Sequence, residues 1–356
     1  MQQKLQRIFI LKNMVEKMNE EIEKSILKFP EMIGEAIKYK IDLKINKKPK
    51  NIIIAGMGGS AIAGDILIDF VYSKLNIPIY VCKDYSLPCF VNKDSLVFIV
   101  SYSGNTEETL SCFKEAKEKN AILIGITSDG ELEKIFKKYR LPLIKIPSGF
   151  QPRVALPYLF FSIIVALKSI GILKNFDKEI KEAIKILKNI RKKYSSENKL
   201  KKFGEIYKIA KNVKKSDAII IYTQDSLKGV ATRIKNQINE NSKMLAWIGL
   251  IPEIGHNEIS GWQEVKKSNF SVLLLRDRKE DKRIKIRFEY IKKILKEKAK
   301  IYEIFSEGKS ELAKIFSLIY LGDILSLYLA NERNVDAKNI PLQEKIKEIL
   351  KKSNFK

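Results

Sequence analysis

The positions of apolar and polar residues along this chain predict a protein in which strands and helices alternate. Short apolar runs rich in β-branched residues predict buried strands, and segments with apolar residues at helical spacing separate most of them. In the first half, the predicted strands are Asn51–Ala55, Ile77–Cys82, Ser95–Ser101, Ala121–Thr127 and Leu141–Ile146, and the predicted helices are Ala61–Ser73, Thr106–Glu118 and Glu131–Lys138. Alternation at this length is typical of a doubly wound, mostly parallel sheet.

The same alternation restarts after a stretch from Arg153 to about Val213 that is almost entirely helical. The later predicted strands are Ala218–Tyr222, Lys243–Trp247, Phe270–Leu275 and Ala299–Ile304, and the later predicted helices are Lys228–Asn239, Lys282–Lys298, Lys309–Ala330 and Leu342–Lys352. The simplest interpretation is two α/β units of similar build joined by helices.

Domain boundaries follow from this order of elements. We predict a leading helical segment over residues 1–50, a first α/β domain over 51–152, a helical junction over 153–213 and a second α/β domain over 214–356. In the leading segment, apolar residues recur at helical spacing and predict one helix face packed on the first domain. These residues are Met14, Met18, Ile22 and Ile26.

The composition is that of a globular protein. The 356 residues leave room for two or three domains, and 45% apolar with 31% charged residues exclude a disordered chain. No segment has the length and apolarity of a membrane span, and the first residues lack the features of a signal peptide. We therefore expect a cytoplasmic protein.

The net charge of +25 comes from 67 Lys and Arg residues against 42 Asp and Glu residues. Such a charge would suit a nucleic acid or an anionic membrane. However, the lysines are spread along helical faces, often alternate with Glu, and form no basic block interleaved with aromatic residues. We expect neither partner, since attraction of a phosphorylated metabolite is a sufficient use for the charge. A Lys- and Ile-rich composition is also typical of heat-adapted organisms.

Cys82, Cys89 and Cys112 are an odd number of cysteines without metal-ligand spacing. We expect them to be reduced thiols in or near the core. Because the chain contains a single histidine, His256, we expect no zinc site.

A glycine-rich stretch, Ile52–Asp65, combines a predicted strand, a turn at Gly56–Ser60 and the start of a helix. In this geometry, backbone N–H groups and the helix dipole can meet an anion. The glycine spacing does not fit a dinucleotide-binding fingerprint, and no Lys-Ser/Thr pair follows as in a P-loop. The alternative interpretation is a tight turn without a ligand.

A second loop, Ser101–Thr106, also follows a predicted strand and opens a helix. It carries the hydroxyls of Ser101, Ser103 and Thr106, which together with helix N–H groups can bind a phosphate without a lysine. The alternative is plain helix capping, because a Ser/Thr turn with Glu three residues later forms a capping box. Capping alone would not need all three hydroxyls.

Three charged or titratable residues could carry chemistry. Arg153 follows the last strand of the first unit, near the ligand edge of the sheet, although a surface salt bridge would explain it equally well. Glu240 lies in a polar cluster at a helix end and could be a general base or a solvated side chain. His256 is the only imidazole available for acid/base chemistry, and its alternative is an incidental surface residue.

Taken in order, these motifs resemble the bifunctional phosphoglucose/phosphomannose isomerases of archaea and some bacteria, in the sugar isomerase (SIS) domain superfamily. The matching stretches are Gly56–Ser60, Ser101–Thr106, Gln151–Arg153, Asn239–Asn241 and Pro252–Glu258. The resemblance implies an α/β fold of two SIS domains, each a flavodoxin-like parallel sheet flanked by helices. It also implies a homodimer with shared active sites.

The resemblance assigns roles to individual residues. Ser60, Ser101, Ser103 and Thr106 match the phosphate-binding hydroxyls, Gly59 a close backbone approach, Arg153 the enediolate-stabilising arginine and Glu240 the base between C1 and C2. His256 matches a ring-opening residue contributed by the neighbouring subunit. A ring-opening lysine on the C-terminal helix matches Lys347, with Lys345 as the alternative. Gly255 departs from the family pattern, which commonly has Asn before the histidine.

The implied function is aldose–ketose isomerisation of glucose 6-phosphate and mannose 6-phosphate to fructose 6-phosphate through a cis-enediolate. This chemistry requires neither a metal nor a redox cofactor. Two alternatives remain at this point: a non-catalytic SIS module that senses a sugar phosphate, and the isomerase half of an amino-sugar synthase with an ammonia-supplying partner.

Overall fold

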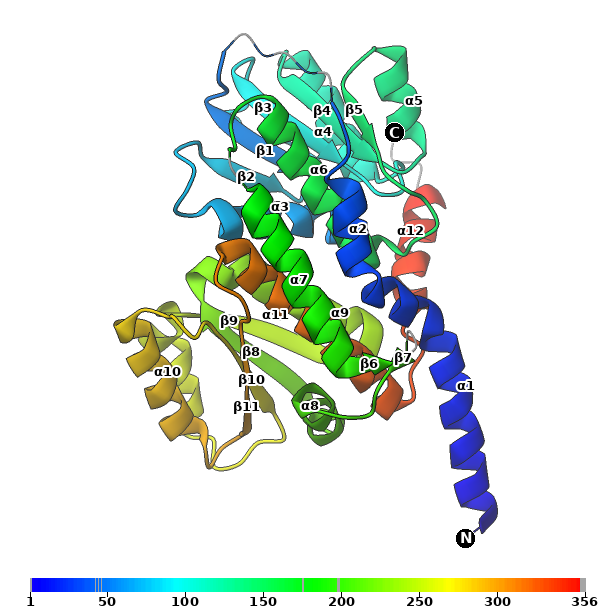
Figure 1. Ribbon diagram of the computed structural model, residues 1–356, viewed down its shortest axis with the longest axis vertical. Helices are drawn as coiled ribbons and strands as arrows, with labels where there is room; N and C mark the ends of the chain where they lie inside the picture. Colours follow the sequence, from blue (N-terminus) through cyan, green and yellow to red (C-terminus); the bar gives the residue numbers. More distant parts are fainter. Residues whose placement is uncertain are drawn as a thin grey trace.

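The computed structural model describes residues 2–41, 43, 45, 47–174, 176–196 and 199–352. It contains two parallel sheets with a layer of helices between them (Figure 1). The central core cluster includes Ile54 of the first sheet, Leu273 of the second and Phe316 of the helices between them. Two smaller clusters cover the outer faces of the sheets. The central helices therefore join the two sheets through one continuous apolar core.

The first sheet has five strands in the order β2-β1-β3-β4-β5, all parallel. The strands are β1 Asn51–Ala55, β2 Ile79–Cys82, β3 Ser95–Val100, β4 Ile122–Thr127 and β5 Leu143–Lys145. The helices between them are α3 Gly58–Val71, α4 Glu107–Glu118 and α5 Glu131–Lys138. This is the flavodoxin-like order, and the predicted parallel α/β sheet is confirmed.

The second sheet has four parallel strands in the order β11-β10-β8-β9. The strands are β8 Ala218–Gln224, β9 Leu245–Ile251, β10 Ser271–Arg276 and β11 Lys300–Phe305. The helices are α9 Lys228–Ser242, α10 Lys282–Leu295, α11 Glu311–Arg333 and α12 Pro341–Lys352. The prediction began the β9 strand at Lys243, but Lys243 is the left-handed residue that ends α9, with φ of 52°.

The stretch between the sheets is not entirely helical. It contains α6 Leu156–Ser169, α7 Asp177–Tyr194 and α8 Glu205–Val213. The described residues also form four short 3-10 turns, η1 Pro152–Val154, η2 Asp225–Leu227, η3 Glu253–His256 and η4 Glu258–Trp262. A small antiparallel ribbon, β6 Ser195–Ser196 with β7 Lys199–Leu200, separates α7 from α8. Periodicity missed it because two-residue strands are too short to show a pattern.

From the sequence we predicted no segment with the length and apolarity of a membrane span, but among the described residues α11 is one helix that meets both criteria. Its most apolar window is 94% buried inside the protein, against α7, α8 and α9. The apolar surface of α11 is therefore used for packing in the core.

The leading segment forms two helices, α1 Gln2–Leu27 and α2 Phe29–Ala36. α1 packs on α11 and β7, and α2 packs on α6 and α7. These elements lie outside residues 51–152, the first domain on which the leading segment was predicted to pack. Ile22 and Ile26 are buried as predicted, but Met14 is 58% and Met18 40% exposed, so the predicted face was wrong at those two positions. The buried face instead contains the polar residues Asn19 and Glu23, which bond to distant backbone groups. Hydrophobic periodicity cannot detect such positions.

The two α/β units are joined at the contact of α3 with α9. The carboxylate of Asp69 on α3 accepts hydrogen bonds from the N–H groups of Gly229 (3.1 Å) and Val230 (2.9 Å) at the start of α9. Burial raises the pKa of Asp69 to about 8, although these two hydrogen bonds oppose the increase. In the folded protein, the carboxyl group of Asp69 is therefore protonated and neutral below about pH 8.

This pKa predicts that Asp69 makes the protein less stable as the pH rises from about 4 to about 8. Over that range the carboxyl ionises in the unfolded chain but keeps its proton in the folded chain, so rising pH favours unfolding. The free energy of unfolding of Asp69→Asn relative to the unmodified protein should increase with pH, by at most about 1.4 kcal/mol per pH unit. Urea denaturation at several pH values measures this difference.

Asp65→Asn is the matched control, because Asp65 lies one turn earlier on α3 and is paired with Lys83 at 2.7 Å. A difference between Asp69→Asn and the unmodified protein that stayed constant over the pH range would contradict the prediction.

Candidate active site

The two predicted anion-binding loops meet at one point of the first sheet. The Gly56–Ser60 turn leaves β1, and the Ser101–Thr106 loop leaves β3, the neighbouring strand. In the order β2-β1-β3-β4-β5, the chain turns to opposite sides of the sheet after β1 and β3. Ligands of doubly wound sheets bind outside the carboxyl ends of the strands at such a switch point.

The hydroxyl groups of the two loops are connected. The Ser60 Oγ accepts a hydrogen bond from the N–H of Tyr102 at 3.2 Å, which joins the first turn to the second loop. The Oγ of Ser101 and the Oγ1 of Thr106 lie 2.9 Å apart in a hydrogen bond, and the exposed Ser103 Oγ accepts a weaker bond from Asn105 N–H at 3.3 Å. These contacts connect the two loops and give each of the four predicted hydroxyls a hydrogen-bond partner.

The capping alternative for this loop does not match the geometry. Thr106 is the N-cap of α4, but its side chain makes no capping hydrogen bond and pairs with Ser101 instead. Neither Thr106 of α4 nor Met57 of α3 caps its helix with a side chain, so the first N–H groups of both helices face the loops without a side-chain cap. Two uncapped helix N-termini beside several hydroxyls are well suited to a phosphate.

Gly104 holds the second loop in place. Its φ is +69°, and a Cβ at this position would lie 1.7 Å from the carbonyl oxygen of Asp129. Only glycine fits this left-handed and closely packed position. The loop is therefore fixed against the β4–α5 turn.

The backbone of Gly59 lies close in space to η1, the 3-10 turn that contains Arg153. A Cβ on Gly59 would lie 2.8 Å from the carbonyl oxygen of Pro152 and 3.3 Å from the backbone nitrogen of Arg153. The first anion-binding turn and Arg153 are therefore packed backbone to backbone.

Arg153 reaches from η1 across to the second unit. Its side chain is 3% exposed, and its Nη1 lies 3.6 Å from the Oε2 of Glu240. Its Nε donates to the Oδ1 of Asn241 at 2.8 Å, and its Nη2 donates to the carbonyls of Ala337 (2.5 Å) and Lys338 (3.1 Å). Burial lowers the pKa of Arg153, and Glu240 opposes this effect. Arg153 is thus a buried cation with a defined orientation, in contrast to a surface salt bridge.

Glu240 stands in the last turn of α9 and is accessible. Its side chain is 21% exposed, and Arg153 is its ion-pair partner among the described residues. Lys243 donates from its Nζ to the Glu240 carbonyl at 2.5 Å, and burial together with Arg153 lowers the pKa of Lys243. A carboxylate that is accessible and beside a fixed guanidinium can take and return a proton.

His256 is exposed on η3, beyond the end of β9. In the part of the chain that the structure describes, no hydrogen bond or ion pair joins it to Arg153 or Glu240. Its segment is anchored by other residues: Trp262 donates to the Tyr222 hydroxyl at 2.9 Å, and that hydroxyl donates to Glu258. The fold therefore presents His256 on a fixed surface turn.

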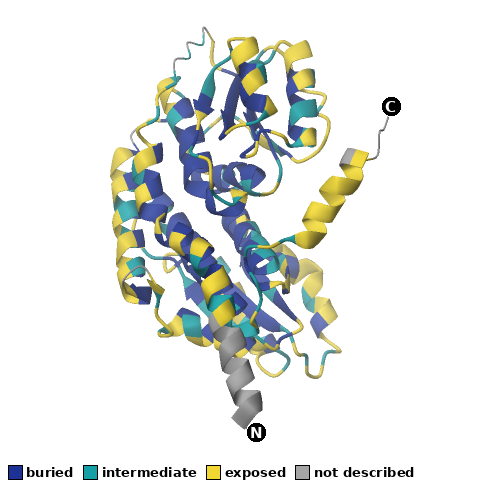
Figure 2. Cartoon of the chain, turned by 90° about the vertical axis from the view of Figure 1, so that its right-hand side faces the viewer, coloured by how far each residue is buried: buried dark blue, intermediate teal, exposed yellow. Residues whose placement is uncertain are grey.

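Lys345 and Lys347 lie on α12, which is exposed from residue 341 to residue 350 and stands clear of the body of the protein (Figure 2). One chain does not bring either lysine to Arg153 and Glu240. The same helix exposes apolar side chains, with Leu342 77% and Ile346 58% exposed.

Two domain families match the chain, the SIS domain at residues 45–133 and the bacterial phospho-glucose isomerase C-terminal SIS domain at residues 204–350. A bifunctional phosphoglucose/phosphomannose isomerase from Caldicellulosiruptor bescii is 38% identical over 312 residues, which cover 86% of this chain and 92% of the relative. One from Aquifex aeolicus is 36% identical over 306 residues, covering 85% and 91%. The chain belongs to the bifunctional phosphoglucose/phosphomannose isomerase family. The SIS domains inferred from the sequence are confirmed.

Solved structures agree with this family at the level of the fold. The hypothetical protein TT0462 from Thermus thermophilus has a TM-score of 0.72 at 15% identity, and the match covers 93% of this chain and 90% of TT0462. The C-terminal domain of glucosamine-fructose-6-phosphate aminotransferase from Francisella tularensis has a TM-score of 0.65 at 18% identity, covering 88% of this chain and 97% of that domain.

The sequence did not reveal several residues around this isomerase-family site. Asn241 orients Arg153, and Tyr102 links the two predicted anion-binding loops. The sequence contains a signal for Asn241, which lies in the Asn239–Asn241 motif beside Glu240. The Ala337 and Lys338 carbonyls leave no sequence signal, because every residue has the same backbone carbonyl.

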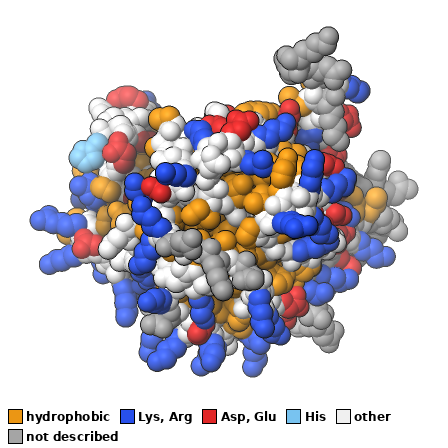
Figure 3. Space-filling model, turned by 90° about the horizontal axis from the view of Figure 1, so that it is seen from above, with side chains coloured by type: hydrophobic (Ala, Val, Ile, Leu, Met, Phe, Trp, Pro, Cys, Tyr) orange, Lys and Arg blue, Asp and Glu red, His pale blue; other side chains and the backbone are white. Residues whose placement is uncertain are grey.

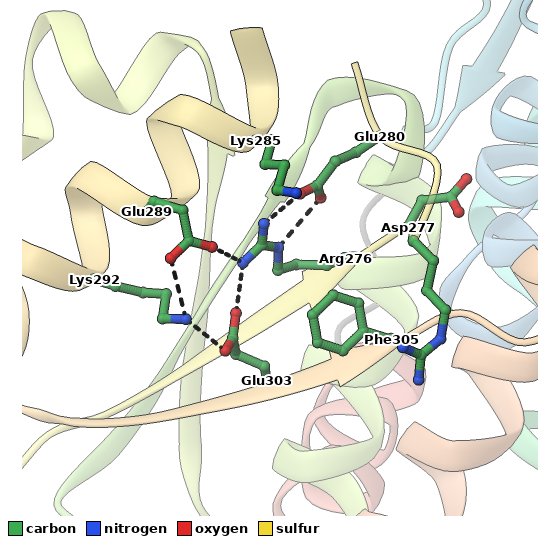
Figure 4. Close-up of a pocket in the computed structure, with 9 residues that line it drawn as sticks. Arg276, Asp277, Glu280, Lys285, Glu289, Lys292, Glu303 and Phe305 are labelled. Carbon is green, nitrogen blue, oxygen red and sulfur yellow. Dashed lines mark hydrogen bonds and ion pairs between the residues drawn. The ribbon is translucent and has the colours of Figure 1, made fainter. Parts of the chain in front are cut away.

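A separate pocket lies at the carboxyl ends of β10 and β11 (Figure 4). At its centre Arg276 is bonded to Glu280, Glu289 and Glu303, and Lys292 joins the last two carboxylates. The Arg276 guanidinium also packs 4.7 Å from the Phe288 ring centroid. Because four basic and four acidic side chains line this pocket and balance one another in charge, we assign the cluster to the packing of the sheet edge.

Positive charge is spread over the surface. On the face drawn in Figure 3, Lys and Arg side chains are distributed around the molecule with acidic side chains among them. This distribution agrees with the sequence, which contains no basic block.

Proposed function

We propose that this protein interconverts glucose 6-phosphate and mannose 6-phosphate with fructose 6-phosphate through a cis-enediolate. The observation that carries the proposal is the 3.6 Å approach of the Arg153 guanidinium to the Glu240 carboxylate beside two anion-binding loops. The names of the relatives at 36–38% identity support the same reaction.

The loops provide the anchor for the 6-phosphate. Ser60, Ser101, Ser103 and Thr106 would donate hydroxyl hydrogens to the phosphate oxygens, and the N-termini of α3 and α4 would add N–H groups and a positive dipole end. The existing bond between Ser101 and Thr106 keeps their hydroxyls close together before the substrate binds. Gly59 keeps this anchor at a short distance from Arg153.

Glu240 would move the proton. In the open-chain aldose it takes the C2 proton, and it returns that proton to C1 while the hydroxyl proton moves from O2 to O1. The enediolate formed in between carries negative charge on oxygen, which the preoriented Arg153 stabilises. Because C2 is planar in the enediolate, rotation about C2–C3 allows protonation of either face, so one site can serve both sugars. The net reaction is a shift of hydrogen within the substrate and requires no redox cofactor.

Ring opening would use His256 and Lys347, with Lys345 as the alternative. Neither reaches Arg153 and Glu240 within one chain, so we propose a homodimer in which His256 enters the site from the neighbouring subunit. The exposed position of His256 and the exposed apolar side chains of α12 support this arrangement. We expect the enzyme to act in the cytoplasm.

One relative favours a second candidate function. A D-glucosamine-6-phosphate 4-epimerase from Sulfolobus acidocaldarius is 28% identical over 304 residues, covering 85% of this chain and 90% of the relative. An epimerase at C4 would also need a phosphate anchor and a proton-transferring group, but would not form a ketose.

A substrate assay separates these candidates. The purified protein is incubated with glucose 6-phosphate, mannose 6-phosphate or glucosamine 6-phosphate, without added metal or glutamine. We expect fructose 6-phosphate from the first two sugars. A change of glucosamine 6-phosphate alone would favour epimerisation, and binding of the sugar phosphates without turnover would favour a sensing module.

Mixed dimers test the shared site. Glu240→Gln and His256→Ala should each be inactive alone, but co-expression should restore about one quarter of the activity, because half of the randomly paired dimers are mixed and each has one intact site of two. If His256 acts within its own chain, every site in the mixed dimer contains one substitution and no activity returns.

A further inference from the structure

We propose that the N-terminal helix α1 positions Arg153, through Asn19 and the Val335–Lys338 segment that connects α11 with α12. This inference rests on the proposed catalytic role of Arg153. It assigns a function to a part of the chain that carries none of the sequence motifs.

Asn19 is a buried polar residue on α1 with 0% exposure. Its Nδ2 donates to the Oδ1 of Asn331 at 2.7 Å and to the Val335 carbonyl at 3.2 Å. Its Oδ1 accepts from the N–H of Ala337 at 2.7 Å. One amide thus uses its donor and its acceptor on the same distant segment, because a side-chain amide carries both kinds of group.

Ala337 transmits this contact to Arg153. It is fully buried, its N–H is bonded to Asn19, and its carbonyl accepts from the Nη2 of Arg153 at 2.5 Å. The N–H of Val335 still bonds to the Ala330 carbonyl of α11, which ends at the left-handed Asn334 with φ of 54°. The N–H of Ala337, further along, is bonded to a side chain and not to the backbone of a helix or strand. Side-chain contacts must therefore fix the position of the Ala337 carbonyl.

The contacts of Arg153 determine where its Nη1 edge points, and Nη1 itself also donates to the Oε1 of Gln151 at 3.5 Å. Asn241 holds the Nε, and the Nδ2 of Asn241 is in turn bonded to Ser326 on α11 at 2.9 Å. The Ala337 and Lys338 carbonyls hold the Nη2. A planar guanidinium fixed at these two nitrogens directs Nη1 toward Glu240. Loss of the carbonyl contacts would let this edge rotate away from the reacting atoms.

A purely structural role for Asn19 is the competing explanation, and α1 offers a matched residue to test it. Glu23 lies one turn later, is 4% exposed and accepts from the N–H of Leu200 at 2.5 Å. It anchors the same helix, but to β7 and away from Arg153. If α1 contributes only stability, Asn19→Ala and Glu23→Ala should have the same consequences.

The first experiment compares kcat, KM and melting temperature of the two variants. We expect Asn19→Ala to lower kcat about tenfold or more with KM within about threefold, because orientation of the reacting groups is lost while the phosphate anchor stays intact. Glu23→Ala should have a similar melting temperature to Asn19→Ala and a kcat within about twofold of the unmodified enzyme. Equal kcat values in the two variants would overturn the proposal.

A second experiment does not depend on activity. Hydrogen exchange of the Arg153 guanidinium is followed by NMR in protein labelled at arginine, with the signal assigned through Arg153→Lys. We expect the Nη2 hydrogens to exchange about tenfold faster in Asn19→Ala and unchanged in Glu23→Ala. Unchanged exchange in Asn19→Ala would refute the positioning role. An inactive unmodified protein would refute the proposed function, and the exchange rates would still decide the role of Asn19.

If Asn19→Ala does not fold, Asn331→Ala provides the same comparison, because the Asn331 Oδ1 fixes the orientation of the Asn19 amide. The same faster exchange and lower kcat are then expected, and values equal to those of Glu23→Ala would again overturn the proposal.

Discussion

Replacement of Glu240 by Gln is expected to lower kcat for formation of fructose 6-phosphate by about 10²–10⁴-fold. The amide has the shape of the carboxylate but cannot accept a carbon-bound proton and return it. The dissociation constant for the sugar phosphate should change little, because the phosphate anchor lies on other elements. Steady-state kinetics and calorimetric binding measure the two quantities separately.

Glu31→Gln is a suitable control for the change of charge, since Glu31 is paired with Arg191 in the helical layer at 2.7 Å. Its kinetics should match those of the unmodified protein. Undiminished turnover in Glu240→Gln would refute the role of Glu240 as the base. A loss of binding equal to the loss of turnover would show that Glu240 acts in binding rather than in proton transfer.

Replacement of Asp323 by Leu is expected to lower the free energy of unfolding by about 3–5 kcal/mol. Arg233 on α9 and Asp323 on α11 form a buried pair with exposures of 2% and 0% and hydrogen bonds of 3.1 Å and 2.8 Å. Burial raises the pKa of Asp323, and Arg233 opposes the increase. The single substitution leaves the guanidinium buried and unpaired. Urea denaturation measures the loss.

The double substitution Arg233→Met with Asp323→Leu is the matched comparison. It removes both charges and fills the space with apolar atoms, so it should recover most of the lost free energy of unfolding. If the double variant is as unstable as the single one, the destabilisation comes from altered packing and the explanation by an unpaired charge is wrong.

Local pattern was enough to predict the sheets. Runs such as Asn51–Ala55 and Ser95–Val100 are apolar along their length because both faces of a parallel sheet are covered. The helix at Glu131–Lys138 was predicted with its observed bounds, since Gly130 with φ of +86° begins it sharply. The pattern failed at Met14 and Met18, where buried polar residues occupy the helix face that apolar residues were expected to fill.

The two halves of the site also differ in how far the local sequence could place their residues. Ser60, Ser101 and Thr106 lie where a strand passes into the following helix, so neighbouring sequence was sufficient to place them. The contact of Arg153 with Glu240 depends on the packing of η1 against α9 and on the Val335–Lys338 segment, which no local pattern encodes. His256 and Lys347 were predicted from resemblance, and a single folded chain leaves them apart from Arg153, so their roles stay predictions.

The close packing of α3 on α9 has a consequence for how substrate reaches the site. A Cβ on Gly229 would lie 2.6 Å from the carbonyl oxygen of Asp65, so the two helices touch at the backbone where the α/β units meet. Hinge bending at this contact would break it together with the bonds from Asp69. We therefore expect the two α/β units to keep their relative position while the substrate binds and the product leaves.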